Sequence, residues 1–255
     1  MSYERELERA AELLVNARFG TALTGAGIST PSGIPDFRSA GSGLWEFANP
    51  FEVASIYAFR QHPQAFYDWV RPLVKLVVNA EPNPAHHALS ELGRMGIVEA
   101  VITQNIDGLH QRAESNCVYE IHGHFRRATC IRCYRSVPSS KLVQAFIEDG
   151  EIPCCEACGG VIKPDIILLG EQLPAKVVAA ARQAARNSDV MIVAGTSLEV
   201  APAGDIPLIP KKHGGKLIFV NLGPTYLDRL ADVTIRADVA EALPRLVEAV
   251  RTLST

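Results

Sequence analysis

The chain has 255 residues, of which 47% are hydrophobic and 21% charged, and its formal net charge is −3. This balance supports a packed core and excludes a disordered or low-complexity chain. No apolar run reaches the roughly 18 residues of a membrane span, and Met1 to Arg9 lacks an apolar signal core. We therefore expect a cytoplasmic protein without a membrane partner, and the negative charge gives no reason to expect direct nucleic-acid binding.

Helices and strands are predicted to alternate along most of the chain. Ser2 can cap a first helix whose apolar stripe is formed by Leu7, Ala10, Ala11, Leu14 and Val15. In the first half of the chain, the pattern then predicts a strand at 21–24, a long loop at 31–50, helices at 50–60 and 63–78, a helix that begins at Asn83-Pro84 and a strand at 98–102. In the second half, it predicts an apolar β-branched stretch at 161–169, a helix at 176–187 and a strand at 190–193. A further helix, a strand at 216–220 and a closing helix at 239–252 follow.

This alternation predicts an α/β fold built on a doubly wound parallel sheet. Such sheets bind ligands at the carboxyl ends of their strands. Three polar loops, 25–38, 103–110 and 195–202, follow predicted strands, so we expect them to meet at one binding edge. The cysteine-rich block interrupts the alternation, which indicates an inserted module.

Four cysteines form two pairs with two residues between the members of each pair: Cys130 and Cys133, Cys155 and Cys158. Four thiolates at this spacing favour one tetrahedral zinc, closed to water and therefore structural. The alternative is a set of unrelated core cysteines. Cys154 is a spare neighbour, and Cys117 lies in an expected apolar strand, where it would be a small core residue.

The first polar loop carries a glycine turn and a charged, aromatic stretch. Gly25-Ala26-Gly27 follows a strand, as a phosphate-binding turn does, but Thr30 replaces the third glycine of such motifs, and a plain tight turn fits equally well. Pro35-Asp36-Phe37-Arg38 adds an acid, an aromatic ring and a guanidinium, which suit a nucleotide. A solvated turn with an Asp–Arg pair is the alternative.

Amide, carboxylate and imidazole groups gather later in the chain. Gln104, Asn105 and Asp107 follow a strand, where they can bind a polar ring such as a carboxamide, although Asp107 could instead only cap a helix. Either His122 or His124 could act as a general base, because neutral imidazole is available near pH 7. A lone histidine is more often structural, so this interpretation depends on the whole set of segments.

Taken together, these segments resemble the sirtuins, the NAD-dependent protein lysine deacetylases and deacylases. The shared motifs occur in the family's order and span nearly the whole chain. They are GAGIS at 25–29, SGIPDFR at 32–38, GLW at 43–45, TQNID at 103–107, HG at 122–123, the two cysteine pairs, GE-x-LP at 170–174 and GTSLEVAP at 195–202. Such a series is far more specific than any one of its motifs.

The resemblance implies a Rossmann-like NAD-binding domain and a small inserted domain, with NAD and an acyl-lysine peptide in the cleft between them. The discontinuous large domain would comprise 1–45, 82–127 and 164–255. The small domain would combine a helical module at 46–81 with a zinc ribbon at 128–163.

The resemblance also implies roles for individual residues. His122 would be the catalytic base, with Asn105 and Asp107 beside the reacting ribose. NAD would contact Gly25, Ala26, Gly27, Asp36, Phe37, Arg38, Gln104, Asn105, Ile106, Asp107, Gly195, Thr196, Ser197, Asn221 and Val239. The peptide backbone would add as a strand between 171–173 and 199–200. Its contacts would be Ile167, Leu169, Gly170, Glu171, Leu173, Glu199 and Val200.

In the implied reaction, the acyl oxygen of lysine attacks the ribose carbon that carries nicotinamide, and nicotinamide leaves. His122 then draws a proton from the ribose hydroxyls, so that one hydroxyl attacks the imidate carbon. The products are free lysine, nicotinamide and acyl-ADP-ribose. The protein would supply orientation, a water-poor cleft and one base.

The chain departs from the family at three places. Leu168 and Leu169 stand where an aromatic residue usually walls the acyl-lysine tunnel, which leaves the acyl preference open. Tyr67 is followed three residues on by Val70, whereas relatives that remove acidic acyl groups have arginine there, so we expect neutral acyl chains. Glu114 replaces a glycine that is usual in the family.

Three other functions are compatible with parts of this pattern. A mono-ADP-ribosyltransferase would use the same cleft, and so would a non-catalytic NAD or ADP-ribose sensor that binds a protein partner. His122 and Asn105 disfavour the sensor. The net charge disfavours a nucleic-acid-binding zinc ribbon, although four arginines make the ribbon locally basic: Arg126, Arg127, Arg132 and Arg135.

Overall fold

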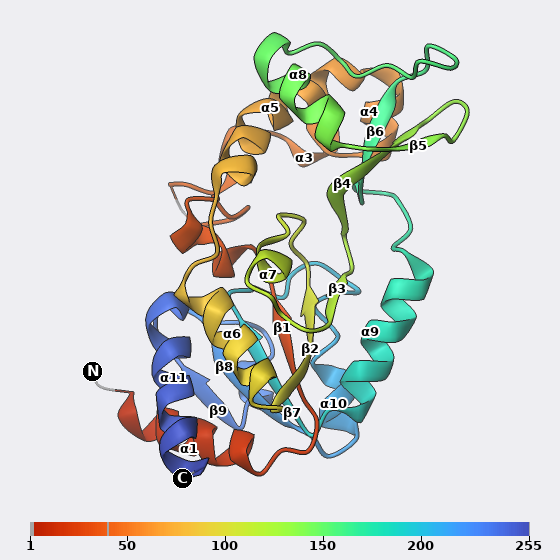
Figure 1. The fold of residues 1–255 in the computed structure, drawn as a ribbon. Coiled ribbons are helices and arrows are strands. Elements are labelled where there is room, and N and C mark those ends of the chain that lie inside the picture. The colour runs from red at the N-terminus through yellow and green to blue at the C-terminus, as the bar shows by residue number, and fades with distance from the viewer. Residues whose placement is uncertain (1–2, 40, 255) are drawn as a thin grey trace.

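The computed structural model describes residues 3–39 and 41–254, so the predicted cap Ser2 lies outside the described residues. Figure 1 shows two lobes of unequal size, with both chain ends on the larger, lower lobe. The lower lobe contains a six-stranded sheet between helices, and the upper lobe a three-stranded sheet with helices of its own. This arrangement confirms the predicted fold class.

The large sheet is parallel throughout, with strand order β3-β2-β1-β7-β8-β9. Its strands are β1 Gly20–Thr24, β2 Val98–Thr103, β3 Val118–Glu120, β7 Val190–Ala194, β8 Lys216–Val220 and β9 Val233–Ile235. The central strands β1 and β7 are buried along their whole length, as expected where helices cover both faces of a sheet. The apolar strand expected around Cys117 corresponds to β3, which begins one residue later, whereas the short edge strand β9 was not predicted.

Helices cover both faces of this sheet. Those on one face are α1 Glu4–Val15, α6 Pro84–Arg94 and α11 Val239–Ser254. Those on the other are α9 Ala175–Asn187 and α10 Leu208–Lys212. The predicted apolar stripe of α1 is buried at four positions: Leu7, Ala10, Ala11 and Leu14. Helix α6 begins after the predicted cap Asn83, whose side chain accepts a hydrogen bond from the Ala85 amide.

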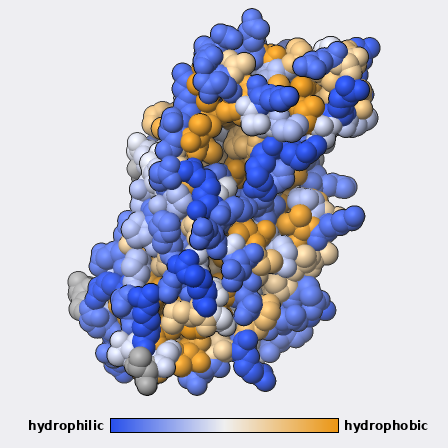
Figure 2. Space-filling view, in the orientation of Figure 1, coloured by the Kyte–Doolittle hydropathy of each residue, from blue (hydrophilic) through white to orange (hydrophobic). Residues whose placement is uncertain are grey.

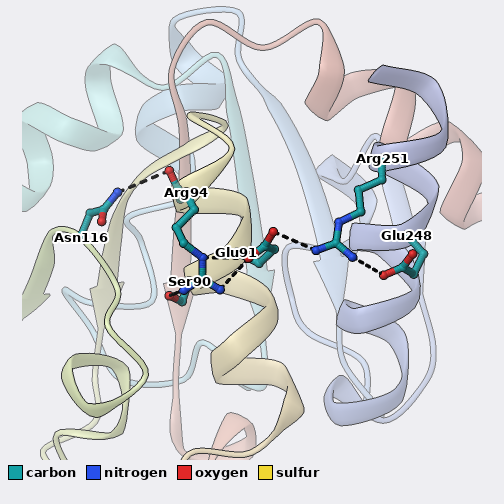
Figure 3. Close-up of polar contacts among 7 residues, drawn as sticks. Ser90, Glu91, Arg94, Asn116, Glu248 and Arg251 are labelled. Atoms are coloured by element: carbon teal, nitrogen blue, oxygen red, sulfur yellow. Dashed lines mark hydrogen bonds and ion pairs between the residues drawn. The ribbon is translucent and has the colours of Figure 1, made fainter. Parts of the chain in front are cut away.

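An ion-pair network joins α6 to α11 (Figure 3). The Glu91 carboxylate accepts hydrogen bonds from Arg94 Nε on its own helix and from Arg251 Nη2 on α11, each at 2.8 Å. Arg251 also donates to Glu248 at 2.7 Å. Because both arginines are half-exposed, solvent screens these pairs, and the helices are held mainly by their shared apolar core.

The upper lobe combines a small sheet with five helices among the described residues. Strand β4 (Gly123–Cys130) pairs antiparallel with β5 (Ser136–Pro138) and β6 (Ile162–Ile166). The helices are α2 Leu44–Phe47, α3 Pro50–Val53, α4 Ile56–Gln61, α5 Pro63–Asn79 and α8 Ser140–Asp149. The apolar stretch at 161–169 therefore contains only a short strand of the small sheet. The single helix expected near 50–60 is two helices, interrupted at 54–55.

One apolar core joins the helical segment of this lobe to its sheet. Phe66 and Tyr67 of α5 pack with Phe146 of α8 and with Ile166 of β6. The domain limits expected at 127/128 and 163/164 fall inside β4 and β6, so these strands run across both limits. The division into domains stays a prediction.

Glu114 adopts a left-handed backbone conformation, with φ of 63°. Residues with a Cβ rarely adopt this conformation, whereas glycine does so readily. A glycine, which the resemblance leads us to expect at this position, would adopt this conformation without strain, whereas this chain accepts some backbone strain there.

The visible face is largely hydrophilic, with hydrophobic residues exposed mainly on the upper lobe and between the lobes (Figure 2). Among the described residues, every helix is too short or too polar to cross a lipid bilayer.

Candidate functional site

The three predicted loops meet at the carboxyl ends of β1, β2 and β7, where they border a cleft of about 680 Å³. The residues that line it belong to the segments 25–42, 104–105, 122, 195–200, 221–224 and 238–239. All of the predicted NAD contacts line this cleft except Ile106 and Asp107. The parallel sheet thus gathers segments that lie far apart in the sequence.

Two glycines let the loops after β1 and β7 pack backbone against backbone. The Gly27 amide donates a hydrogen bond to the Gly195 carbonyl at 2.9 Å. Gly195 has φ of 61°, and a Cβ there would lie 2.2 Å from the Ile28 nitrogen. A side chain would therefore force the loops apart. The close packing leaves backbone at the cleft surface, beside the short 3₁₀ helix Ala26–Ile28.

The Asp36 carboxylate organises its own loop. It accepts hydrogen bonds from the amides of Arg38 (2.9 Å) and Ser39 (2.7 Å) and from the Ser39 hydroxyl. Burial alone would raise the pKa of Asp36, but these hydrogen bonds outweigh it and lower the pKa. The Asp–Arg pair considered as an alternative is not formed: Arg38 pairs instead with Glu199, across the cleft.

An aromatic stack supports the same loop. The Phe37 ring lies 5.0 Å from that of Trp45, and Trp45 lies 5.5 Å from Trp69 of α5, all between ring centroids. Because α5 belongs to the upper lobe, the stack ties the cleft loop to that lobe.

A chain of polar contacts links the loops after β2, β7 and β8. Gln104 Nε2 donates to Thr196 Oγ1 at 2.9 Å, and the Thr196 amide donates to Asn221 Oδ1 at 2.9 Å. Asn221 Nδ2 is buried and has no hydrogen-bond partner among the described residues. Since buried donors are almost always paired, this amide has capacity for a ligand in the cleft.

Asn105 and Asp107 meet at Ser29. Asn105 Nδ2 donates to Ser29 Oγ at 3.0 Å, and the Ser29 hydroxyl donates to Asp107 Oδ2 at 2.8 Å. Asp107 Oδ1 accepts from the Leu109 amide at 2.9 Å, at the start of α7 (Leu109–Arg112), although the N-cap residue of this helix is Gly108. Burial raises the pKa of Asp107, although these hydrogen bonds oppose the shift.

His122 lies between β3 and β4 and lines the cleft. Its Nδ1 lies 3.1 Å from the Gln104 carbonyl oxygen. A carbonyl can only accept, so Nδ1 carries the proton and Nε2 presents a lone pair. Burial lowers the pKa of His122, while the bond to Gln104 partly offsets this effect. The ring is therefore held neutral near pH 7, with one nitrogen available as a base.

Several predicted site residues lie outside this cleft. Ile106 packs against the core of the upper lobe, and Asp107 reaches the cleft residues only through Ser29. Of the predicted peptide contacts, Glu199 and Val200 line the cleft, whereas the segment 167–173 does not.

Sequence reasoning missed part of the cleft wall. The segment 222–224 and Asp238 also line it. The signal was present for the segment, because it follows the predicted strand 216–220, and strand ends of a parallel sheet meet at one edge. Asp238 gave no comparable signal, since its side chain also accepts from the Ala240 amide at the start of α11, an ordinary capping role.

The four predicted zinc ligands form one cluster, with all Sγ atoms within 4.8 Å of one another. The Sγ atoms of Cys130 and Cys158 lie 3.5 Å apart, and those of Cys133 and Cys155 lie 3.7 Å apart. Zn–S bonds of about 2.3 Å give a tetrahedron with edges of about 3.8 Å, whereas a disulfide needs about 2.05 Å. The cysteines are therefore positioned to bind one structural zinc.

The two remaining cysteines stand apart from that cluster. Cys154 is exposed, and its thiol contacts the Ile152 carbonyl. Cys117 lies just before β3 and is only half-buried, so it is not the core residue that we expected. Its carbonyl contributes to the sheet by accepting from the Val101 amide.

These features define an α/β nucleotide-binding protein with an inserted module whose four cysteines are positioned to bind zinc. The model of the Sir2 family matches residues 25–202. The chain is 46% identical over 251 residues to NAD-dependent protein deacylase 2 of Archaeoglobus fulgidus, with 98% of each chain covered. It is 44% identical over 246 residues to the NAD-dependent protein deacetylase of Sulfurisphaera tokodaii, with 96% of each covered. The chain belongs to the Sir2 family, the sirtuins.

Solved structures of the family have the same fold. One Sir2 enzyme superposes with a TM-score of 0.93 at 46% identity, covering 98% of this chain and 99% of its own. Sir2Af2, solved with a myristoylated histone peptide, superposes with a TM-score of 0.85 at 42% identity, with 98% of each chain covered.

Proposed function

We propose a role for each cleft residue in the NAD-dependent deacylation that this protein catalyses. The observation that carries the proposal is the setting of His122. It is a half-buried, neutral imidazole with Nδ1 fixed on a carbonyl and with no partner for Nε2 among the described residues, at the cleft that holds the family's nucleotide motifs. A sensor that only binds the nucleotide has no use for a base held in this way.

NAD would lie along the strand ends. The backbone of Gly25, Ala26 and Gly27 suits the pyrophosphate, with Arg38 as the counter-charge. Gly195, Thr196, Ser197 and Val239 would border the adenosine half, where the unpaired Asn221 Nδ2 would donate to a ribose hydroxyl. Gln104 would border the nicotinamide half. Ile106 and Asp107 would support this half from behind, through the small-lobe core and Ser29.

NAD supplies the ADP-ribose that accepts the acyl group, and nicotinamide as the leaving group. The chain's own residues orient the reactants and move one proton. His122 Nε2 would take the proton from a ribose hydroxyl. Asn105, which donates a hydrogen bond to Ser29, would hold the nicotinamide ribose in place. Asp107 would fix the position of Ser29 by accepting its hydroxyl proton in a hydrogen bond.

The acyl-lysine peptide would add as a strand between 171–173 and 199–200. In support, the backbone groups of Gln172 and Leu173 make no hydrogen bond to the described residues. Leu169 cannot offer its backbone, because its amide and carbonyl bond to Ala54 and Ile56. We therefore assign Leu169, with Ile167 and Gly170, to side-chain and surface contacts, and the strand pairing to the residues beyond Gly170.

We assign neutral acyl chains to this enzyme. Tyr67 donates its hydroxyl to the Ile162 carbonyl, and Arg71, one turn further along α5, donates to the carbonyls of Ile147 and Glu148. Lys163 is paired with Glu171 at 3.0 Å. These groups are therefore committed to the fold and cannot pair with an acidic acyl group. The myristoylated peptide bound by Sir2Af2 shows that a relative accepts a long neutral chain.

We also propose the domain division given above and a cytoplasmic location. The small domain is supported by the apolar core that helical and ribbon segments share. A reducing compartment is supported by six cysteines that are all free thiols, four of them placed for zinc. Fractionation of cells that express the chain tests the location.

One assay tests the function. Purified protein is incubated with NAD and an acetyl-lysine peptide, and free nicotinamide and the peptide mass are followed together. Deacylation requires equal amounts of nicotinamide and deacetylated peptide. An ADP-ribosyltransferase would release nicotinamide while a protein or peptide gains the mass of ADP-ribose, and a sensor would release none.

A further inference from the structure

Two buried imidazoles lie behind the cleft, outside its lining. His86 of α6 and His110 of α7 are at most 1% exposed, and their rings meet edge to face with centroids 4.9 Å apart. His86 Nε2 and His110 Nδ1 have no hydrogen-bond partner among the described residues. Unpaired buried nitrogens on two touching rings are unusual, because desolvation penalises a polar atom that forms no hydrogen bond.

The proton positions on His110 follow from its contacts. Thr24 Oγ1 donates its only proton to Thr103 Oγ1 at 2.9 Å. His110 Nε2 lies 2.8 Å from the same Thr24 oxygen, so Nε2 must be the donor in that contact. Burial lowers the pKa of His110 well below its usual range, so the ring is neutral and Nδ1 is unprotonated.

His86 has the complementary arrangement. The Asn83 amide donates to His86 Nδ1 at 3.3 Å, so this nitrogen accepts and the proton lies on Nε2. Burial also lowers the pKa of His86, to about 4, so it too is neutral at pH 7. The two neutral rings pack edge to face, and neither His86 Nε2 nor His110 Nδ1 forms a hydrogen bond to the described residues.

The chain of contacts ends at the reacting site. Thr103 Oγ1, which accepts from Thr24, also accepts from the backbone amide of Asn105 at 3.0 Å. The hydrogen-bond path from His110 through the two threonines thus runs in one direction and ends on the turn that presents Asn105.

We propose that His110, packed against the His86 ring, is a positioning residue for Asn105: as the Nε2–H tautomer it donates to Thr24, so that Thr24 can donate to Thr103. The proposal rests on the role assigned to Asn105 in the proposed function. In it, the two histidines never touch the reactants. Their role is to fix the direction of the hydroxyl chain beneath the turn.

The first test reads the tautomers directly and does not depend on activity. Long-range ¹H–¹⁵N correlation spectra of uniformly labelled protein at pH 7 should show both His86 and His110 protonated at Nε2 only, with assignments from the single variants. A protonated Nδ1 on His110, or a charged ring on either residue, would overturn the proposal.

The second test is kinetic and uses a matched control on the same strand. Thr21 is also buried on β1 and bonds Ser188 at 2.8 Å, away from the cleft. We expect Thr24→Val to lower kcat about ten- to hundred-fold, as small misplacements of reacting groups do. Affinity for ADP-ribose should be retained, and Thr24→Ser should restore kcat. Thr21→Val should lower stability and leave kcat unchanged.

Equal kcat in Thr24→Val and Thr21→Val would contradict the proposal, since a merely structural hydroxyl affects both alike. If Thr24→Val does not fold, we compare His110→Gln with His110→Phe. The glutamine keeps a hydrogen-bond donor near the position of Nε2, so only His110→Gln should retain kcat. The wild type is assayed in parallel. Its failure to deacylate would reject the proposed function, while leaving the tautomers to be judged by the spectra.

Discussion

Arg38 Nε lies 2.8 Å from Glu199 Oε2, so an ion pair joins the loop after β1 to the loop after β7 across the cleft. Both side chains are substantially exposed, at 40% and 57%, so the pair contributes only about 0.2–1 kcal/mol. Its importance is positional, because Arg38 is the residue assigned to the phosphates of NAD. Binding NAD would require Arg38 to leave Glu199.

Replacing Glu199 with glutamine should therefore strengthen NAD binding. We expect the Kd for NAD, measured by calorimetry without peptide, to fall by a factor of about 1.5–5, the equivalent of the lost pair. The difference should shrink as salt is added. Glu151→Gln, an exposed acid outside the cleft, is the control for net charge. Weaker NAD binding in Glu199→Gln would show that the carboxylate assists the nucleotide instead.

The cysteine cluster predicts one zinc per chain in freshly purified protein, measured by elemental analysis. Cys130→Ala or Cys155→Ala should lose the metal and unfold the ribbon, because structural zinc supplies folding free energy. Cys154→Ala should keep the zinc, since this exposed thiol lies outside the cluster. Protein that folds fully without metal would rule out the structural role.

Loss of the His122 imidazole should separate binding from chemistry. We expect His122→Ala to bind NAD with little change and to lose deacylation by about 10²-fold or more, the usual effect of removing a general base. His124→Ala is the matched control, since His124 does not line the cleft, and its effect should be mild. The reverse order of effects would show that His124 is the base.

The pH dependence of kcat/KM should show an acid limb with a midpoint below 6.5. Burial lowers the pKa of His122 from that value, and the neutral form is the base. Activity is therefore present above the lowered pKa and is lost as the pH falls through it. The residual activity of His122→Ala should lack this limb. A midpoint above 6.5 would mean that the charged form is stabilised in the free enzyme.

We expect the charge of the acyl group to affect kcat/KM more than its chain length does. Leu169 is 39% exposed and apolar. We expect kcat/KM for acetyl and butyryl peptides to exceed that for a succinyl peptide, because Arg71 and Lys163 already bind groups of the protein and cannot pair with the carboxylate. Longer fatty-acyl chains gain about 0.8 kcal/mol per CH₂ that they bury. Leu169→Phe should change the chain-length profile. Succinyl as the best substrate would contradict the charge argument, and identical profiles would remove Leu169 from the tunnel.

The sequence was most informative where spacing and periodicity carry the structure. The cysteine pairs, the Asn83 cap and the strands β1, β2, β7 and β8 follow from local patterns, and the fold class follows from their alternation. The edge strand β9, which was not predicted, is three residues long, too short for a period of two to be recognised.

Contacts between distant segments could not be predicted in the same way. Nothing local in the sequence pairs Arg38 with Glu199 rather than with Asp36, since the choice depends on how the loops after β1 and β7 face each other. The His86–His110 contact depends likewise on the packing of α6 against α7. Sequence reasoning placed His110 only at the end of a polar loop.

Because of the stack of Phe37, Trp45 and Trp69, the intrinsic tryptophan fluorescence of this protein should report on changes at the cleft. Trp45 and Trp69 are the only tryptophans in the chain, and their rings are stacked at 5.5 Å with an interplanar angle of 14°. Emission excited at the tryptophan band therefore comes entirely from the point where the cleft loop meets the upper lobe. Any movement of that loop that separates the rings should change the signal, without an attached dye and without background from other tryptophans.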